Sequence, residues 1–201
     1  MEWWGYVLLV VAVVIFYAGI LATFRARRLD SMNKQVTKSR RALENALAAR
    51  ARYAHEVGAS GVLDPASAIL LTAASEDARD ASMFPVVEDG LEAIRFGDDG
   101  GVRGGRAKLG EGFSPDRLAI ESELSSTLRL TVDELEPEDL DDESSALIAD
   151  LNKAREEVRL TRRFHDSHVT QVQRLRRTKL VRILRLTGSA PKPRTVDMDD
   201  V

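Results

Sequence analysis

An uninterrupted apolar run near the N-terminus is the strongest pattern in the chain. No charged residue occurs from Trp3 to Phe24. A helix of about 22 residues, rising about 1.5 Å per residue, spans the roughly 30 Å hydrocarbon core of a bilayer. The run therefore predicts a transmembrane helix over residues 3–24, preceded by a short extracytoplasmic N-terminus of residues 1–2.

Charges on either side of this run predict its orientation. Glu2 precedes it, and a basic group follows it: Arg25, Arg27, Arg28, Lys34, Lys38, Arg40 and Arg41. Basic residues next to a span stay on the cytoplasmic side. We therefore expect an N-terminus outside and a cytoplasmic domain at the plasma membrane. A cleaved signal peptide is the alternative, but such peptides begin with a basic region.

Aromatic and basic residues mark the two ends of the predicted span. The aromatic ones fall where an interfacial belt would lie on the outer leaflet, and the basic ones fall at the inner leaflet. We predict that six residues anchor the helix in the lipid bilayer: Trp3, Trp4, Tyr6, Arg25, Arg27 and Arg28.

Beyond the predicted span, apolar residues continue on a single helix face. They recur at spacings of three and four, or multiples of these: Leu29, Met32, Val36, Leu43, Ala46, Tyr53 and Val57. This period is typical of an amphipathic α-helix. We expect the anchor to continue as one rod to Val57, where Gly58 and Gly61 end it.

Two shorter helices begin at capping signals. Asp64 before Pro65 joins an acceptor for free amides to a residue suited to the first helical position, and predicts a helix over residues 65–81. Its apolar face is formed by Ala68, Leu71, Ala74 and Ala78. Ser114 before Pro115 repeats the signal and predicts a third helix to about residue 133.

The third helix has one irregular position. Its apolar stripe comprises Leu118, Leu124, Leu128 and Val132. Glu121 interrupts this stripe, although its spacing places it on the same face.

A dense acidic stretch separates the third helix from a long final one. Residues 133–143 lack the alternating carboxylates and central glycine of an EF-hand loop, so they predict a solvated connection rather than a calcium site. The final helix should end at Gly188 and Pro191. Its apolar face is marked by Leu147, Leu151, Ala154, Val158, Val172 and Leu175.

Glycines cluster between the second and third helices. Gly100 to Gly105 has the spacing of a phosphate-binding loop, but Arg106 and Ala107 stand where that motif needs lysine and a hydroxyl residue. We interpret residues 97–112 as a flexible loop.

These elements predict an all-α fold. An N-terminal transmembrane helix continues into an antiparallel helical bundle, in which the long first and last helices can pack together like a coiled coil. We expect the cytoplasmic bundle to cover residues 25–186 and a C-terminal tail to cover residues 187–201.

The sequence excludes several kinds of chemical site. The chain has no cysteine, which excludes disulfides, thiolate metal sites and cysteine nucleophiles. No serine lies in a Gly-x-Ser-x-Gly elbow, and nothing around the carboxylates of the acidic connection suggests a pocket or a raised pKa. We therefore expect no enzyme activity, no catalytic residue and no cofactor.

His165 and His168 form the sharpest site hypothesis. They are three apart on one helix, close enough for both imidazoles to reach one metal ion. A metal site needs three or four ligands, and the remaining histidine, His55, lies on a different helix. We favour a packing role for both, and a metal- or ligand-responsive membrane sensor is the alternative.

The end of the final helix is rich in arginine and leucine. Residues 174–186 mix apolar and basic side chains, which suits contact with anionic lipid. The two classes do not separate cleanly around a helical wheel, which weakens an interfacial helix. With only 5% aromatic residues, the chain offers few stacking groups, so we expect no nucleic-acid partner.

Most of the chain resembles the LemA family, and the resemblance is strongest from Glu121 to Arg194. The run Arg162-Arg163-Phe164-His165-Asp166 is similar to the Arg-Arg-Phe-Tyr-Asn signature on the arginine-rich helix of that family. Residues 123–128 look like its Leu-Ser helix, residues 136–140 are similar to its Tyr-Pro-Asp-Leu turn, and residues 192–193 fall where members often end in Lys-Pro.

The same comparison shows departures that indicate a divergent member. Histidine and aspartate stand at the signature's tyrosine and asparagine, and the family's Leu-Ile-Pro-Asn-Leu stretch is not recognisable around residues 52–61. The resemblance implies a membrane-anchored helical protein with its short N-terminus outside. It implies no established catalytic residue.

Together these patterns predict a membrane-anchored scaffold or adaptor that presents a helical bundle to a protein partner of unknown identity. An anionic-lipid-binding membrane organiser is a further alternative. A second copy of the chain is also a candidate partner, because long amphipathic helices permit self-association.

Overall fold

The computed structural model of the chain describes residues 3–87, 94–96, 102–104, 116–136, 140–178 and 192–200. Four helices contain most of these residues: α1 (Trp3–Ala59), α2 (Pro65–Ala81), α3 (Arg117–Thr131) and α4 (Asp142–Arg176). Two short strands, β1 (Ile94–Phe96) and β2 (Val102–Gly104), pair antiparallel. The all-α prediction is confirmed, and the small hairpin was not predicted.

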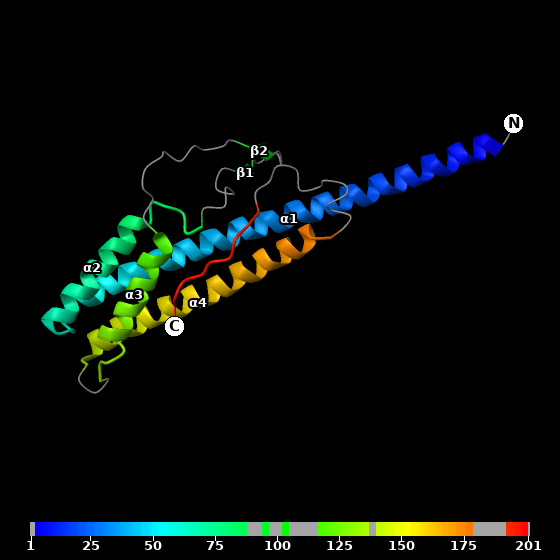
Figure 1. Cartoon of the computed structure of the whole chain (residues 1–201). Coiled ribbons are helices and arrows are strands. Elements are labelled where there is room, and N and C mark those ends of the chain that lie inside the picture. The colour runs from blue at the N-terminus through cyan, green and yellow to red at the C-terminus, as the bar shows by residue number, and fades with distance from the viewer. Residues whose placement is uncertain are drawn as a thin grey trace.

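α1 is a rod that carries the other helices along one half (Figure 1). Its 57 residues correspond to about 86 Å of helix, at about 1.5 Å per residue. α4 lies antiparallel beside the second half of α1, and α2 and α3 lie together near the end remote from Trp3 (Figure 1). The expected bundle with long first and last helices is confirmed.

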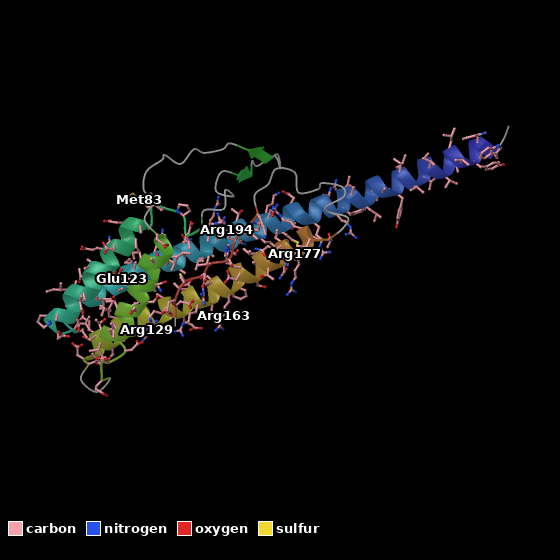
Figure 2. The ribbon with its side chains drawn as sticks, viewed as in Figure 1. Met83, Glu123, Arg129, Arg163, Arg177 and Arg194 are labelled. Atoms are coloured by element: carbon pink, nitrogen blue, oxygen red, sulfur yellow. The ribbon has the colours of Figure 1, made fainter. Side chains whose placement is uncertain are left out.

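The two halves of α1 have different surroundings. Every side chain from Trp3 to Leu21 is exposed, and Figure 2 shows these side chains projecting on all sides of the helix. Among the described residues, α1 is the one helix with a stretch long and apolar enough to cross a membrane. From Val36 onwards, the same helix contributes fully buried residues to the bundle.

Three apolar clusters follow one another along the bundle. The cluster farthest from the apolar run includes Ala54, Val57, Leu71, Leu124, Leu128 and Leu151. The middle one includes Leu43, Leu47, Val86, Val87, Val158, Val196 and Met198. The nearest contains Val36, Val169 and Val172, with Met32 and Leu175 packed against them. The stripes read from the sequence therefore face the core.

Gly58 does not end α1, which continues through it to Ala59. A Cβ atom built at Gly58 would lie 2.6 Å from Thr72 Oγ1 and 3.3 Å from the Thr72 nitrogen. Gly58 is therefore needed where α1 and α2 approach closely. Gly61 serves the turn, because its φ of +82° is a conformation that residues with a Cβ rarely adopt.

Aspartates cap the three helices that follow α1. Asp64 Oδ1 accepts from the Ala66 and Ser67 amides, and α2 has the predicted bounds. Asp116 caps α3, so the prediction that this helix begins at the Ser114 signal was wrong. Asp141 caps α4.

Both ends of α4 differ from the sequence prediction. It begins at Asp142, so part of the predicted acidic connection forms its first turn. Carboxylates in this turn are stabilised by the positive end of the helix dipole. It ends at Arg176 rather than near Gly188, with Arg177 as its C-cap. Residues 179–191 lie outside the described part of the chain.

Two further predictions concern segments that lie partly outside the described residues. The predicted loop at 97–112 lies outside them except for residues 102–104, which form β2. The predicted tail at 187–201 is described over residues 192–200, and these pack on the bundle.

Candidate functional site

A carboxylate is fully buried in the apolar stripe of α3. Glu121 is 1% exposed. Its Oε2 atom accepts a hydrogen bond from Arg50 Nη2 at 2.7 Å, and its Oε1 atom accepts one from Arg117 Nε at 2.9 Å. Arg50 also donates to Ser125 Oγ at 2.8 Å. Glu121 therefore interrupts the apolar stripe because it belongs to an ionic network that joins α1 to α3.

Arg117 extends this network to the end of α2. Its Nη1 atom donates to the carbonyl oxygens of Ala81 at 2.8 Å and Phe84 at 2.6 Å. Both arginines are buried. Burial lowers the pKa of the Arg50 guanidinium, while the Glu121 carboxylate acts in the opposite direction. Because guanidinium stays protonated in proteins, Glu121 compensates two buried positive charges.

Residues 192–200 form an extended segment that lies over the middle of the bundle, drawn in red in Figure 1. We call these residues the clasp. Val196 and Met198 are buried in the middle apolar cluster, whereas Thr195 and Asp197 are exposed. The clasp therefore alternates between the bundle and solvent with the period of a β-strand.

The clasp runs antiparallel to α4. Gln173 Nε2 donates to the Pro193 carbonyl at 2.9 Å, and Arg162 Nη1 donates to the Met198 carbonyl at 2.8 Å. Between these contacts, α4 advances about 16 Å at about 1.5 Å per residue. The clasp covers about the same length at about 3.3 Å per residue. The extended clasp and α4 therefore cover the same distance between these two contacts.

Two clasp amides also bond to side chains of the bundle. The Val196 amide donates to Asp166 Oδ1 at 3.0 Å, and the Asp199 amide donates to Ser122 Oγ at 3.1 Å. Asp166 belongs to α4 and Ser122 to α3. Side chains of two helices therefore recognise the clasp backbone.

Two carboxylates complete the clasp contacts. Asp200 Oδ1 lies 2.8 Å from Arg162 Nη2, and the Asp200 side chain is only 3% exposed. Asp199 Oδ2 lies 2.8 Å from Arg129 Nη2 in a pair open to solvent. Asp200 is also close enough to Arg50 to raise the pKa of that guanidinium against the effect of burial. The clasp therefore brings a buried negative charge to an arginine-rich part of the bundle.

The contacts of the clasp offset a large part of the conformational entropy that is lost when the clasp is ordered. Fixing the backbone costs about 1–2 kcal/mol per residue. Burying an apolar side chain contributes about 1.5–3 kcal/mol, and a hydrogen bond contributes about 1 kcal/mol. Val196 and Met198, together with the four backbone contacts, provide a gain of the same order as the cost of ordering nine residues.

His165 and His168 occupy different surroundings on α4. His165 is fully buried, and its Nδ1 lies 3.1 Å from Ser39 Oγ of α1. His168 lines a groove between α1 and α4 with Lys38 and Phe164. His55 lies 16 residues after Ser39 on α1, or about 24 Å along the helix, and pairs with Ser75. The structure therefore does not bring the three histidines together.

No group of three histidine, aspartate or glutamate side chains in the described part of the chain is arranged to hold a metal ion. The metal hypothesis for His165 and His168 thus has no third ligand among the described residues. The hydrogen bond between His165 and Ser39 of α1 gives His165 a place in the packing between the two long helices.

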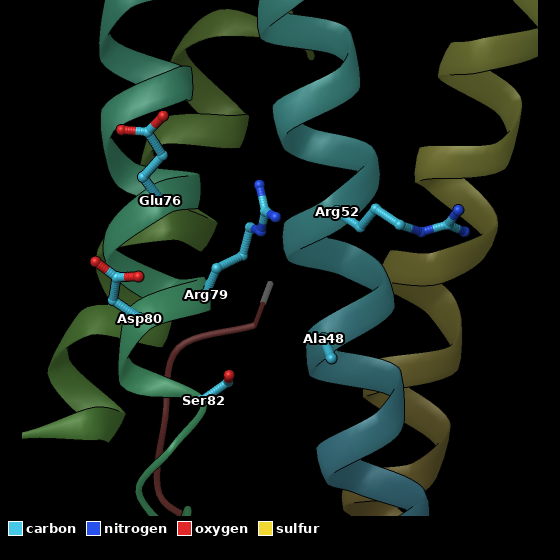
Figure 3. A pocket seen from close by; sticks show the side chains of 6 residues that line it. All are labelled: Ala48, Arg52, Glu76, Arg79, Asp80 and Ser82. Atoms are coloured by element: carbon cyan, nitrogen blue, oxygen red, sulfur yellow. The ribbon is translucent and has the colours of Figure 1, made fainter.

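A second groove, of about 650 Å³, lies between α1 and α2. Figure 3 shows Arg79 of α2 extending toward α1, whereas Glu76 and Asp80 point away from α1. Arg52 on the α1 side extends away from α2 (Figure 3). The charged groups that line the groove therefore do not converge on one point.

The predicted anchoring residues lie on the part of α1 outside the bundle. Trp3, Trp4 and Tyr6 are exposed, and the Trp3 and Trp4 ring centroids are 4.3 Å apart. Arg27 and Arg28 are also exposed. A third basic residue of this group, Arg25, is half-buried.

The residues that hold the clasp and the arginines of the Glu121 network were not recognised in the sequence. Arg162 and Asp166 were read as part of the LemA-like signature, and Arg50 and Arg117 were not singled out. The signals available were Glu121 in an apolar stripe, with Arg117 one helical turn before it, and the alternation of Val196 and Met198.

No protein-family model, curated protein or solved structure matches this chain.

Proposed function

We propose that this chain is a single-pass membrane protein whose cytoplasmic bundle acts as a scaffold or adaptor for another protein. The observation that carries the proposal is the division of α1. Residues 3–21 are apolar and exposed on all sides, and the same helix enters the core of the bundle from Val36. An apolar surface of this extent needs an apolar environment, and a bilayer matches its length.

The continuous helix also sets the position of the bundle. From Phe24 to Val36, α1 advances about 18 Å. No break in α1 separates the apolar part from the bundle. The rod therefore holds the bundle at a defined distance from the bilayer, which suits a scaffold.

Charge supports an orientation with the N-terminus outside and the bundle in the cytoplasm at the plasma membrane. Arg25, Arg27 and Arg28 directly follow the apolar run, while Glu2 precedes it. The resemblance to the LemA family supports the same arrangement. The proposal assigns the chain no catalytic residue and no cofactor.

A protein partner is supported by apolar side chains on the surface of the bundle. Ile69 and Leu70 on α2 are 70% and 60% exposed. Their helix, α2, lies near the end of the bundle remote from the proposed membrane (Figure 1). Contiguous exposed apolar surface marks interaction sites, and we place the contact with the partner at these two adjacent residues.

Capture from detergent extracts of intact cells tests this proposal. Three full chains are compared: wild type, the Ile69→Ser/Leu70→Ser variant, and a chain with exposed Glu76→Gln and Asp77→Gln substitutions on the same helix. An anchor-only chain ending near Arg41 provides the background. We expect a reproducible partner with wild type and the glutamine variant, reduced at least about fivefold by the serine variant, as for a central apolar contact. Recovery of no protein above the anchor-only background would count against an adaptor.

One observation favours a second candidate, contact with anionic lipid. Leu175 near the end of α4 packs against the same apolar cluster as Met32 of α1, and Met32 lies about 12 Å beyond Phe24 along the helix. The basic end of α4, with Arg174 and Arg177, thus lies near the proposed membrane surface. If the end of α4 binds anionic lipid, Arg174→Gln/Arg177→Gln should reduce binding to vesicles containing phosphatidylserine, and the reduction should fade at high salt.

A further inference from the structure

The clasp shows what kind of ligand the surface beneath it accepts. Its hydrogen bonds with Gln173, Asp166 and Ser122, and the one between Arg162 Nη1 and the Met198 carbonyl, all involve backbone groups of the clasp. Backbone groups are present in any peptide. This set of contacts therefore recognises extended backbone rather than one particular sequence.

Side-chain selection comes from three clasp positions that follow the buried Pro193 and face the bundle. Val196 and Met198 enter the apolar cluster that contains Leu43, Leu47 and Val158. The Asp200 side chain is 3% exposed and pairs with Arg162. Successive inward positions thus carry an apolar, an apolar and an acidic side chain, each two residues apart.

Charge at the surface favours a carboxylate at the last of these positions. Arg162 pairs with Asp200, and Arg50 lies close enough for Asp200 to raise its pKa. Without a carboxylate there, Arg162 and buried Arg50 would lose a compensating charge. Arg129 provides a second, more exposed cation for an acidic residue at the preceding position.

We infer that the surface formed by α1, α3 and α4 beneath the clasp is a binding site for an extended acidic peptide of a partner protein. The peptide has the pattern apolar-x-apolar-acidic-acidic, and the clasp occupies the site in cis as its competitor. This inference deepens the proposed adaptor function and rests on it. It is measured on the purified chain, so its failure is distinguishable from the absence of a cellular partner.

The test uses the full chain in detergent micelles and a fluorescent peptide with the sequence of residues 192–201. A full chain with Asp199→Asn and Asp200→Asn has a weakened clasp. We expect it to bind the peptide at least about tenfold more tightly than wild type, because competition in cis is reduced. Arg162→Met added to this variant should remove most of the binding. A peptide carrying D199N and D200N is the matched control ligand and should bind at least about tenfold more weakly.

The rate of thiol labelling measures release of the clasp in chains that retain Asp199 and Asp200. The protein has no cysteine, so each substitution introduces a single thiol. Met198→Cys places it at a buried position of the clasp, and Thr195→Cys places it at an exposed position of the clasp. Ala78→Cys places it at a buried position on α2. Peptide in tenfold excess over its Kd should raise the labelling rate of Met198→Cys about tenfold. The rates at the other two positions should stay unchanged.

Two results would overturn the inference. Absence of saturable peptide binding to both chains, with Met198→Cys protected at every peptide concentration, would make the clasp a permanent part of the core. Labelling of Met198→Cys that rises with protein concentration in the absence of peptide would assign the exchange to a second copy of this chain.

Discussion

Glu121 balances two arginines inside the bundle, and its charge is needed because both remain protonated. We predict that Glu121→Gln lowers the free energy of unfolding by about 3–5 kcal/mol, since it leaves Arg50 and Arg117 with uncompensated buried charge. Denaturation of the full chain in detergent, followed by circular dichroism, measures this loss.

Exposed Glu123, two residues further along α3, provides the control. Glu123→Gln should change the free energy of unfolding by less than about 0.5 kcal/mol. Equal effects of the two substitutions would show that the buried network adds nothing to stability.

A carboxylate at the end of α3 should make stability depend on pH. The hydrogen bond from Arg155 lowers the pKa of Asp133. A lowered pKa in the folded state stabilises the protein above the unfolded pKa of about 3.9, and this contribution is lost as the pH falls through the folded value.

We therefore predict that Asp133→Asn costs about 0.2–1 kcal/mol at pH 7, a small effect because the Asp133 side chain is 44% exposed. The difference from wild type should shrink as the pH falls below about 4. Denaturant titrations of both chains at several pH values measure it. A difference that stays constant down to pH 2 would mean that the ion pair is not its source.

Close packing of α1 on α2 depends on Gly58. An added Cβ would meet Thr72 Oγ1 at 2.6 Å. We predict that Gly58→Ala lowers the free energy of unfolding by about 1–3 kcal/mol, as expected for overpacking. Thermal unfolding of the full chain checks the prediction.

Two further variants separate packing from helix propensity. Thr72→Ala in the Gly58→Ala background removes the nearest atom and should recover part of the loss. Gly19→Ala, at a position with no atom within 4 Å of the added Cβ, should cause no loss. A similar loss at both glycines would contradict the packing explanation.

Helices with local signals were the predictable elements. Asp64 and Pro65 act within one turn, and the bounds of α2 agree with the prediction. The final helix carries no equally local stop signal near Arg176, where it ends. Gly58 was misread because the sequence shows a helix-weakening residue but not the neighbour for which its small size is needed.

The clasp could not be predicted in the same way. Its contacts join residues that are 20 to 77 positions apart in the chain, for example Gln173 with Pro193 and Ser122 with Asp199. Such contacts depend on the packing of α3 and α4, which no short window of sequence describes. The buried Glu121 network has the same origin, although the interrupted stripe did mark its position.

At the scale of the whole molecule, the division of α1 gives a topology that can be tested with single thiols. The chain contains no cysteine, so Glu2→Cys and Asp197→Cys each provide one thiol. We predict that a membrane-impermeant maleimide labels Glu2→Cys in intact cells and labels Asp197→Cys only after the membrane is permeabilised. Labelling of both before permeabilisation would contradict the proposed orientation.

Membrane retention should depend on the exposed apolar part of α1. Val11 and Val14 are exposed in the middle of this part. Val11→Arg/Val14→Arg places two charges near the bilayer centre, at a cost of about 2.5–3.5 kcal/mol each. We expect this variant to leave the membrane fraction on carbonate extraction, while Val11→Leu/Val14→Leu remains. Retention of the arginine variant would contradict membrane anchoring by α1.

Proximity labelling in the native membrane tests the adaptor proposal most directly. The labelling enzyme is fused after Val201 of the full chain and, as a control, after an anchor-only chain ending near Arg41. The proposal predicts a short, reproducible set of proteins enriched by the full chain over the anchor. Equal labelling by the two fusions would contradict an adaptor role for the bundle.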